Sequence, residues 1–182
     1  MSRDLKDLVP KMRKISKELI SQCEKSGYVM RPYFTLRDPF EQAALWRQSR
    51  SIEEITKRIE SFIEEDARFL AYCLEKVGPK FGDHVTNAAP GYSWHQWGEA
   101  MDCFWLVDKE AEWSSQKKIN GFNGYRNYSA IARKLGLTSG GLWKSIKDWP
   151  HVQLRPESNP GYEMTPAEIS SEMEKRFANA FT

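Results

Sequence analysis

The chain has 182 residues, 40% hydrophobic and 29% charged, and its 27 Lys and Arg against 25 Asp and Glu leave a net charge of +2. This length and composition fit a single globular domain over residues 1–182 with a sizeable core. The charge is too small to favour nucleic acid as a partner. No segment approaches the ~20 consecutive apolar residues of a membrane span, so none is expected.

In the first half of the chain, apolar spacing predicts three helices and one strand. Gly27 ends the first helix, Pro32 places the strand at a sheet edge, and Pro39 opens the second helix. The expected elements, in order, are a helix over 4–25, a strand over 28–36, a helix over 39–48 and one long helix over 52–77.

The second half begins with a loop and carries short strands between helices. Gly140-Gly141 marks a tight turn, and Thr165 with Glu168 forms a capping box. The expected elements are a strand over 99–107, a helix over 125–135, a strand over 151–154 and a last helix from Thr165 to Phe181. Because the strands are few, short and set among helices, we predict an α+β fold with a small, mainly antiparallel sheet flanked by helices.

Two of the three histidines have a carboxylate nearby in the sequence: His95 with Asp102, and His151 with Asp148. Two imidazoles and one carboxylate are enough to hold a catalytic zinc ion with one open position, and the fourth group could act as a general base. Each residue also has an ordinary interpretation, since a lone histidine is usually a hydrogen-bonded residue and Asp148 lies in a turn-like Lys-Asp-Trp-Pro segment.

The strand over 99–107 bears on this choice. It places Asp102 beside bulky apolar residues, where an unpaired carboxylate would be costly to bury and a metal cation would remove that cost. Cys103 is the next residue, but neighbours in a strand point to opposite faces, which argues against Cys103 as a ligand. The three cysteines are odd in number and far apart, which favours buried thiols over a disulfide framework.

The pattern SxHxxGxAxD from Ser93 to Asp102, followed by Gly-Gly-x-Trp and DxxHxQ, resembles the zinc peptidases of the VanY-type D-alanyl-D-alanine carboxypeptidase group. It is most similar to the branch with phage L-alanyl-D-glutamate endopeptidases. The segments 37–50 and 85–91 also resemble that family's sequence, in the same order. The resemblance covers a motif-bearing core over about residues 28–155.

The resemblance implies a role for seven residues. The expected zinc ligands are His95, Asp102 and His151; the catalytic base is Asp148; Arg37 holds a substrate carbonyl or carboxylate; and Gln42 and Ser93 are supporting polar groups of the substrate-binding cleft. Two alternatives stay open, because Arg37 could form a surface ion pair with Asp38 or Glu41, and Gln42 could be an ordinary helix residue.

The family resemblance implies a zinc metallopeptidase that hydrolyses a stem-peptide amide bond of peptidoglycan, with L-Ala–D-Glu endopeptidase as the expected activity. The alternatives are a D-Ala–D-Ala carboxypeptidase and a non-catalytic zinc-binding recognition module. Residues 51–83 form a helical insertion where relatives have a short loop, which leaves the exact bond open. The N-terminus has no apolar secretion signal. We therefore expect a monomer made in the cytoplasm that acts on the cell wall after release, as in phage or prophage lysis.

Overall fold

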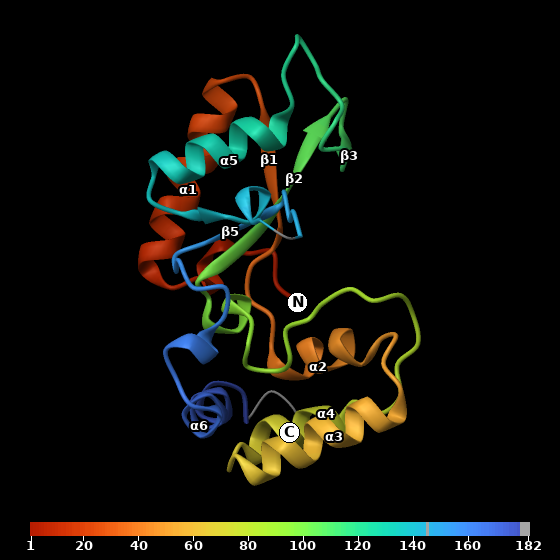
Figure 1. Cartoon of the computed structure of the whole chain (residues 1–182). Helices are drawn as coiled ribbons and strands as arrows, with labels where there is room; N and C mark the ends of the chain where they lie inside the picture. Colours follow the sequence, from red (N-terminus) through yellow and green to blue (C-terminus); the bar gives the residue numbers. More distant parts are fainter. Residues whose placement is uncertain (145, 179–182) are drawn as a thin grey trace. The chain divides into compact units, whose positions relative to one another are not determined.

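A computed structural model describes residues 1–144 and 146–178 and divides the chain into two compact units (Figure 1). Unit 1 consists of Met1–Leu36 and Trp97–Pro156, and unit 2 of Arg37–Gln96 and the chain from Glu157 onward. Within these described residues, six α-helices and a small antiparallel sheet confirm the α+β prediction. Whether residues 1–182 behave as one domain stays a prediction. Within the described residues, no helix has the length and apolar character needed to cross a membrane.

The sheet belongs entirely to unit 1 and is antiparallel throughout. Its strands are β1 (Val29–Phe34), β2 (Ala100–Val107), β3 (Glu110–Glu112), β4 (Thr138–Ser139) and β5 (His151–Gln153). They follow the order β1-β2-β5-β4, and β3 pairs with the C-terminal end of β2. The prediction that Pro32 marks an edge strand is confirmed, because β1 ends this order and pairs with β2.

Helices α1 (Pro10–Lys25) and α5 (Gly124–Lys134) pack on one face of the sheet, as Figure 1 shows. The pleat of β2 directs Met101, Cys103 and Trp105 into the core under these helices, and all three are almost fully buried. Asp102 alternates to the opposite face and stays partly exposed. The prediction that Asp102 and Cys103 point to opposite faces of β2 is therefore confirmed.

The first helix begins later than the predicted 4–25. A 3-10 turn over Leu5–Asp7 comes first, Leu8 is extended, and α1 starts only at Pro10. Proline has no backbone N–H to donate, which suits the first turn of a helix and not its interior. The helical spacing of apolar residues therefore begins at Leu5, although the α-helical hydrogen bonds begin only with α1.

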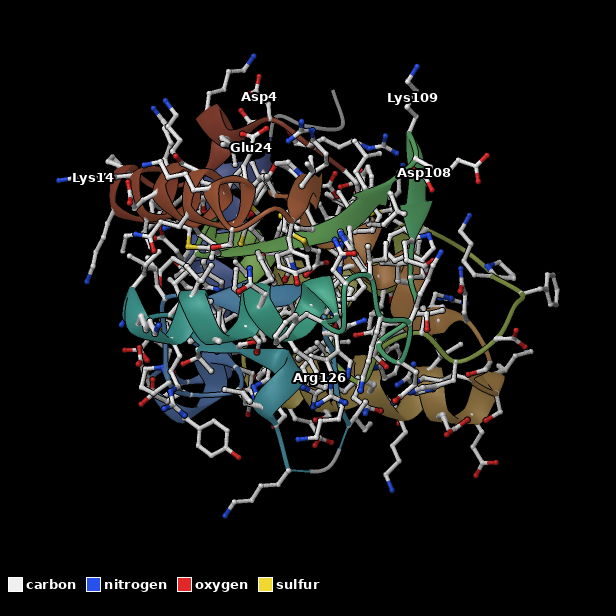
Figure 2. The ribbon with its side chains drawn as sticks, turned by 90° about the horizontal axis from the view of Figure 1, so that it is seen from above. Asp4, Lys14, Glu24, Asp108, Lys109 and Arg126 are labelled. Carbon is white, nitrogen blue, oxygen red and sulfur yellow. The ribbon has the colours of Figure 1, made fainter. Side chains whose placement is uncertain are left out.

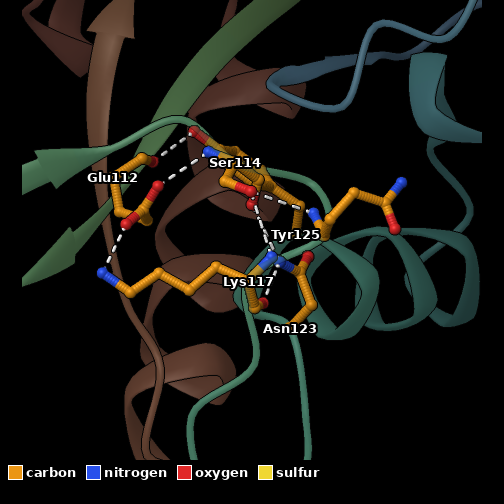
Figure 3. A network of polar contacts seen from close by, with 6 residues as sticks. Glu112, Ser114, Lys117, Asn123 and Tyr125 are labelled. Carbon is orange, nitrogen blue, oxygen red and sulfur yellow. Dashed lines mark hydrogen bonds and ion pairs between the residues drawn. The ribbon is translucent and has the colours of Figure 1, made fainter.

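The short strand β3 was absent from the predicted elements. Asp108 and Lys109 form the two-residue turn that joins it to β2, with positive φ values of 50° and 68°, and they lie at the exposed end of this hairpin (Figure 2). The loop after β3 is held by polar contacts: the Asn123 side chain donates to the backbone oxygens of Ser114 and Lys117, and the Tyr125 hydroxyl donates to that of Glu112 (Figure 3). These bonds fix the start of α5.

Unit 2 is helical, with α2 (Pro39–Arg47), α3 (Ile52–Glu64), α4 (Arg68–Lys76) and α6 (Pro166–Phe177). The prediction of one long helix over 52–77 is wrong. The chain reverses at Asp66, whose φ of 56° ends α3, and the two helices then pack on each other. This break buries Phe62 from α3 and Leu70 and Leu74 from α4 in the core of the unit, which a straight helix would not do.

The other helices of unit 2 follow the prediction. A capping box of Asp38 and Glu41 opens α2, and one of Thr165 and Glu168 opens α6. The expected extension of the last helix to Phe181 lies outside the described residues.

Candidate metal centre

Asp102 and His151 face each other across the central strands of the sheet. They are register partners in the antiparallel pair β2–β5, and Asp102 Oδ1 lies 2.9 Å from His151 Nδ1. Residues opposite each other in such a pair project side by side from the same face. The sheet register thus brings together two residues that are 49 positions apart in the sequence.

The His151 ring is buried and has an acceptor at each nitrogen. Nδ1 faces the Asp102 carboxylate, and Nε2 lies 2.9 Å from Oε1 of Gln153. Burial alone would lower the pKa of His151, but the hydrogen bond and negative charge of Asp102 outweigh it and leave the pKa raised. The Asp102 carboxylate therefore favours a positive charge on the His151 ring.

Asp148 comes close to this pair through a tight turn at the start of β5. The N–H of His151 donates to the backbone oxygen of Asp148, and the N–H of Asp148 donates to that of Gly140. A Cβ at position 140 would lie 2.5 Å from the Asp148 oxygen, so only glycine fits there. Gly-Gly predicts a tight turn in the sequence. In the structure, Gly140 is also needed because the backbones at positions 140 and 148 approach each other closely.

Unit 2 holds the other four predicted residues near one another. The backbone oxygen of His95 accepts from the N–H of Arg37, and the N–H of His95 donates to Oγ of Ser93, both at 3.4 Å. His95 lies in the 3-10 turn Trp94–Trp97 and is 3% exposed. The indole of Trp94 fixes this turn by donating to the backbone oxygen of Glu157.

The buried side chain of Gln42 connects Arg37 to the backbone at Ala88, contacts that the interpretation as an ordinary helix residue does not include. Its Oε1 accepts from Nη1 of Arg37 at 2.9 Å, and its Nε2 donates to the backbone oxygen of Ala88 at 2.6 Å. The side chain is fully buried on α2. Gln42 therefore ties the Arg37 guanidinium to the loop that leads toward His95.

The seven predicted residues thus form two sets, each brought together within one unit. Unit 1 assembles Asp102, Asp148 and His151, and unit 2 assembles the remainder. In the described part of the chain, His95, Asp102 and His151 supply a His–Asp–His group that could hold a metal ion. Cys103 points into the core, on the face opposite to Asp102, as the alternation of the strand predicts.

Two neighbours of His151 belong to the sequence patterns but have no role assigned from the sequence. Gln153 contacts its Nε2, and the ring of Trp143 lies with its centroid 5.2 Å from that of His151. The signal for Gln153 is its position two residues after His151, because that spacing in a strand puts both side chains on one face. The signal for Trp143 is its place as the tryptophan of the Gly-Gly-x-Trp pattern.

Comparisons with known proteins identify the family to which this chain belongs. The family model of VanY, described as D-alanyl-D-alanine carboxypeptidase, matches residues 6–140. The matched range includes His95 and Asp102 and ends before Asp148 and His151.

Two individual proteins are similar to this chain. The peptidoglycan L-alanyl-D-glutamate endopeptidase CwlK of Bacillus subtilis (strain 168) is 36% identical over 107 residues, and the alignment covers 56% of this chain and 60% of CwlK. The crystal structure of the L-Ala D-Glu endopeptidase ChiX of Serratia marcescens matches with a TM-score of 0.44 and 15% identity over 83% of each chain. Because the family model covers well over half of the sequence, this chain belongs to the VanY D-alanyl-D-alanine carboxypeptidase family.

Proposed function

We propose that this chain is a zinc-dependent peptidase that hydrolyses the L-Ala–D-Glu bond of peptidoglycan stem peptides. The observation that carries the proposal is the facing pair of Asp102 and His151, with Asp148 held in the adjoining turn, in a member of the VanY family. The choice of bond is supported by the name of CwlK, an L-alanyl-D-glutamate endopeptidase, which the chain matches over 60% of that protein's length.

The donor atoms fit a zinc ion. His95, Asp102 and His151 offer two imidazole nitrogens and one carboxylate oxygen, which leaves one coordination position for substrate or water. Nδ1 of His151 and Oδ1 of Asp102 lie 2.9 Å apart, so a shared proton or a cation bound by both atoms would relieve the repulsion of their lone pairs. Zinc bound by these residues would act as a Lewis acid and lower the pKa of a water molecule to about 7.

Asp148 is the proposed general base. It accepts a proton from the water that attacks the scissile carbonyl and returns that proton to the leaving amine, so no net proton is consumed in the step. Its backbone is held on both sides, by Gly140 and by His151, and its side chain is only partly buried. A fixed backbone and an accessible carboxylate are what this task needs.

Arg37 and the polar residues around it are assigned to the substrate. The guanidinium binds a carbonyl or carboxylate of the stem peptide, and Gln42 keeps it oriented through the 2.9 Å hydrogen bond. Ser93 supports the turn that carries His95. We further propose that the enzyme is a monomer, made in the cytoplasm, that reaches the cell wall after release in phage or prophage lysis.

A second candidate is a D-Ala–D-Ala carboxypeptidase, and the description of the matching family model favours it. Mass spectrometry of purified muropeptides after digestion separates the two. An endopeptidase releases a peptide that begins with D-Glu, whereas a carboxypeptidase removes a single D-Ala. A digest with no cleavage although zinc is bound would favour a non-catalytic zinc-binding module and contradict the proposal.

A further inference from the structure

The amide of Gln153 lies beside His151 in strand β5 and is almost completely buried, with 1% of the residue exposed. Its Oε1 is 2.9 Å from Nε2 of His151, and its Nε2 donates to the backbone oxygen of Arg155 at 2.8 Å. Both contacts lie within unit 1. The side chains of Gln153 and His151 project from the same face of the sheet as that of Asp102.

The chemistry of these partners fixes which way the amide points. A backbone carbonyl can only accept a hydrogen bond, so the amide nitrogen of Gln153 must face Arg155. The amide oxygen therefore faces His151, and because that oxygen only accepts, Nε2 of His151 must carry a proton. In a neutral ring the lone pair is then on Nδ1, the nitrogen directed at Asp102.

The carbonyl of Arg155 is itself held in place. The Arg155 guanidinium makes two contacts with the Glu99 carboxylate, at 2.6 and 3.3 Å, and the N–H of Leu154 donates to the backbone oxygen of Glu99. Since Glu99 directly precedes β2, these bonds tie the end of β5 to the start of the strand that carries Asp102. The contacts between the end of β5 and Glu99 thus fix the carbonyl that orients the Gln153 amide.

We infer that Gln153 is a positioning residue that keeps His151 in the Nε2-protonated form and so makes Nδ1 the nitrogen offered to zinc. The inference rests on the proposed zinc site and adds a role for Gln153, a residue of strand β5 that is not itself a proposed ligand. A hydrogen bond to the second nitrogen of a ligating histidine fixes both ring orientation and tautomer, and its loss typically weakens metal binding about 10–100-fold.

Zinc affinity in a matched set of variants tests this role. Gln153→Leu removes the acceptor, whereas Gln153→Glu keeps an oxygen toward Nε2 and loses only the donor to the Arg155 backbone oxygen. Val152→Ala truncates the neighbouring buried residue, which points to the other face, and reports what weaker packing of β5 does by itself. By competition with a chelator, we expect Gln153→Leu to bind zinc about 10–100-fold more weakly than wild type, and Gln153→Glu and Val152→Ala to stay within a few fold.

A spectroscopic measurement separates positioning from general destabilisation. In wild-type protein loaded with ¹¹³Cd and labelled with ¹⁵N, we expect metal coupling at Nδ1 of His151 and a slowly exchanging proton at Nε2. Gln153→Leu should speed the exchange of that proton. Equal zinc affinity of Gln153→Leu and wild type, equal weakening in Val152→Ala, or metal coupling at Nε2 would overturn the inference. The proposed function fails differently, by absence of zinc binding or of peptide cleavage in the wild type.

Discussion

Asp102 and His151 are direct partners in the β2–β5 register, and their side chains meet at 2.9 Å on the face of the sheet opposite to α1 and α5. Two central strands of the sheet therefore fix the spacing of the two groups. A site built on strands holds its geometry more closely than one built on loops, which matters because small displacements of ligands or of a base are costly.

Asp148→Asn separates proton transfer from metal binding. Asparagine keeps the size of the side chain but cannot accept a proton at neutral pH, so we expect peptide hydrolysis to fall about 10²–10⁴-fold. Zinc content, measured by atomic absorption, should stay at the wild-type level because Asp148 is not among the proposed ligands. A variant that cleaves as fast as wild type would show that another group is the base.

His151→Ala and Asp102→Ala should each reduce zinc binding strongly, because each removes one of three ligands. His84→Ala is the matched control, since this histidine is exposed and hydrogen-bonds to Ser49 and Asn87. Equilibrium dialysis against zinc followed by metal analysis gives the comparison. Retention of zinc by both ligand variants, with loss in the His84 variant, would place the metal elsewhere.

Gly140→Ala tests the close approach that positions Asp148. The added methyl would lie 2.5 Å from the Asp148 backbone oxygen and 3.1 Å from Cβ of His151, so the turn must shift. We expect about 1–3 kcal/mol lower stability by denaturant unfolding. Activity should fall further than stability alone explains, because the base and a ligand both move.

Gly121→Asn provides the control for Gly140→Ala. Nothing lies within 4 Å of a Cβ at position 121, so this variant adds only the backbone strain of a side chain at a φ of 83°. It should lose some stability but cleave like wild type, because no contact with the site changes. If Gly140→Ala cleaves as fast as Gly121→Asn, the close contact with the Asp148 backbone does not position the base.

The three cysteines should be unreactive in the folded protein. Cys23, Cys73 and Cys103 are fully buried, and burial raises the pKa of all three thiols, that of Cys23 to about 12. Since the thiolate is the reactive form, Ellman's reagent at pH 8 should label none of them in the native state and all three in guanidinium chloride. Rapid labelling of native protein would show that the core around α1 or α4 opens.

Local sequence signals were sufficient where one feature decides the structure. Pro32 correctly marks an edge strand, Pro39 and Thr165 mark helix starts, and the alternation along β2 separates Asp102 from Cys103. The break at Asp66 has no such signal, because neither glycine nor proline stands there and both flanking segments have helical spacing. Packing of α3 against α4 decides it, and periodicity within one segment does not contain that information.

The site shows the same division. Spacing and family resemblance point to the histidines and carboxylates, whereas the bridging position of Gln42 depends on Ala88, 46 positions further along the chain, and the need for glycine at position 140 depends on the path of the backbone back to Asp148. Such contacts follow from the tertiary fold. The very short strands β3 and β4 escape prediction because Glu-Ala-Glu and Thr-Ser offer no run of apolar β-forming residues, whereas the equally short β5 contains Val152 and follows Pro150.

The most direct test of the proposed function is a zinc titration of chelator-stripped protein, with bound zinc and L-Ala–D-Glu cleavage measured on the same samples. We predict that cleavage is absent in the stripped protein, rises in proportion to bound zinc and saturates at one ion per chain. Full cleavage without zinc, or cleavage that does not follow zinc occupancy, would contradict the assignment of His95, Asp102 and His151 as the ligands of a catalytic metal.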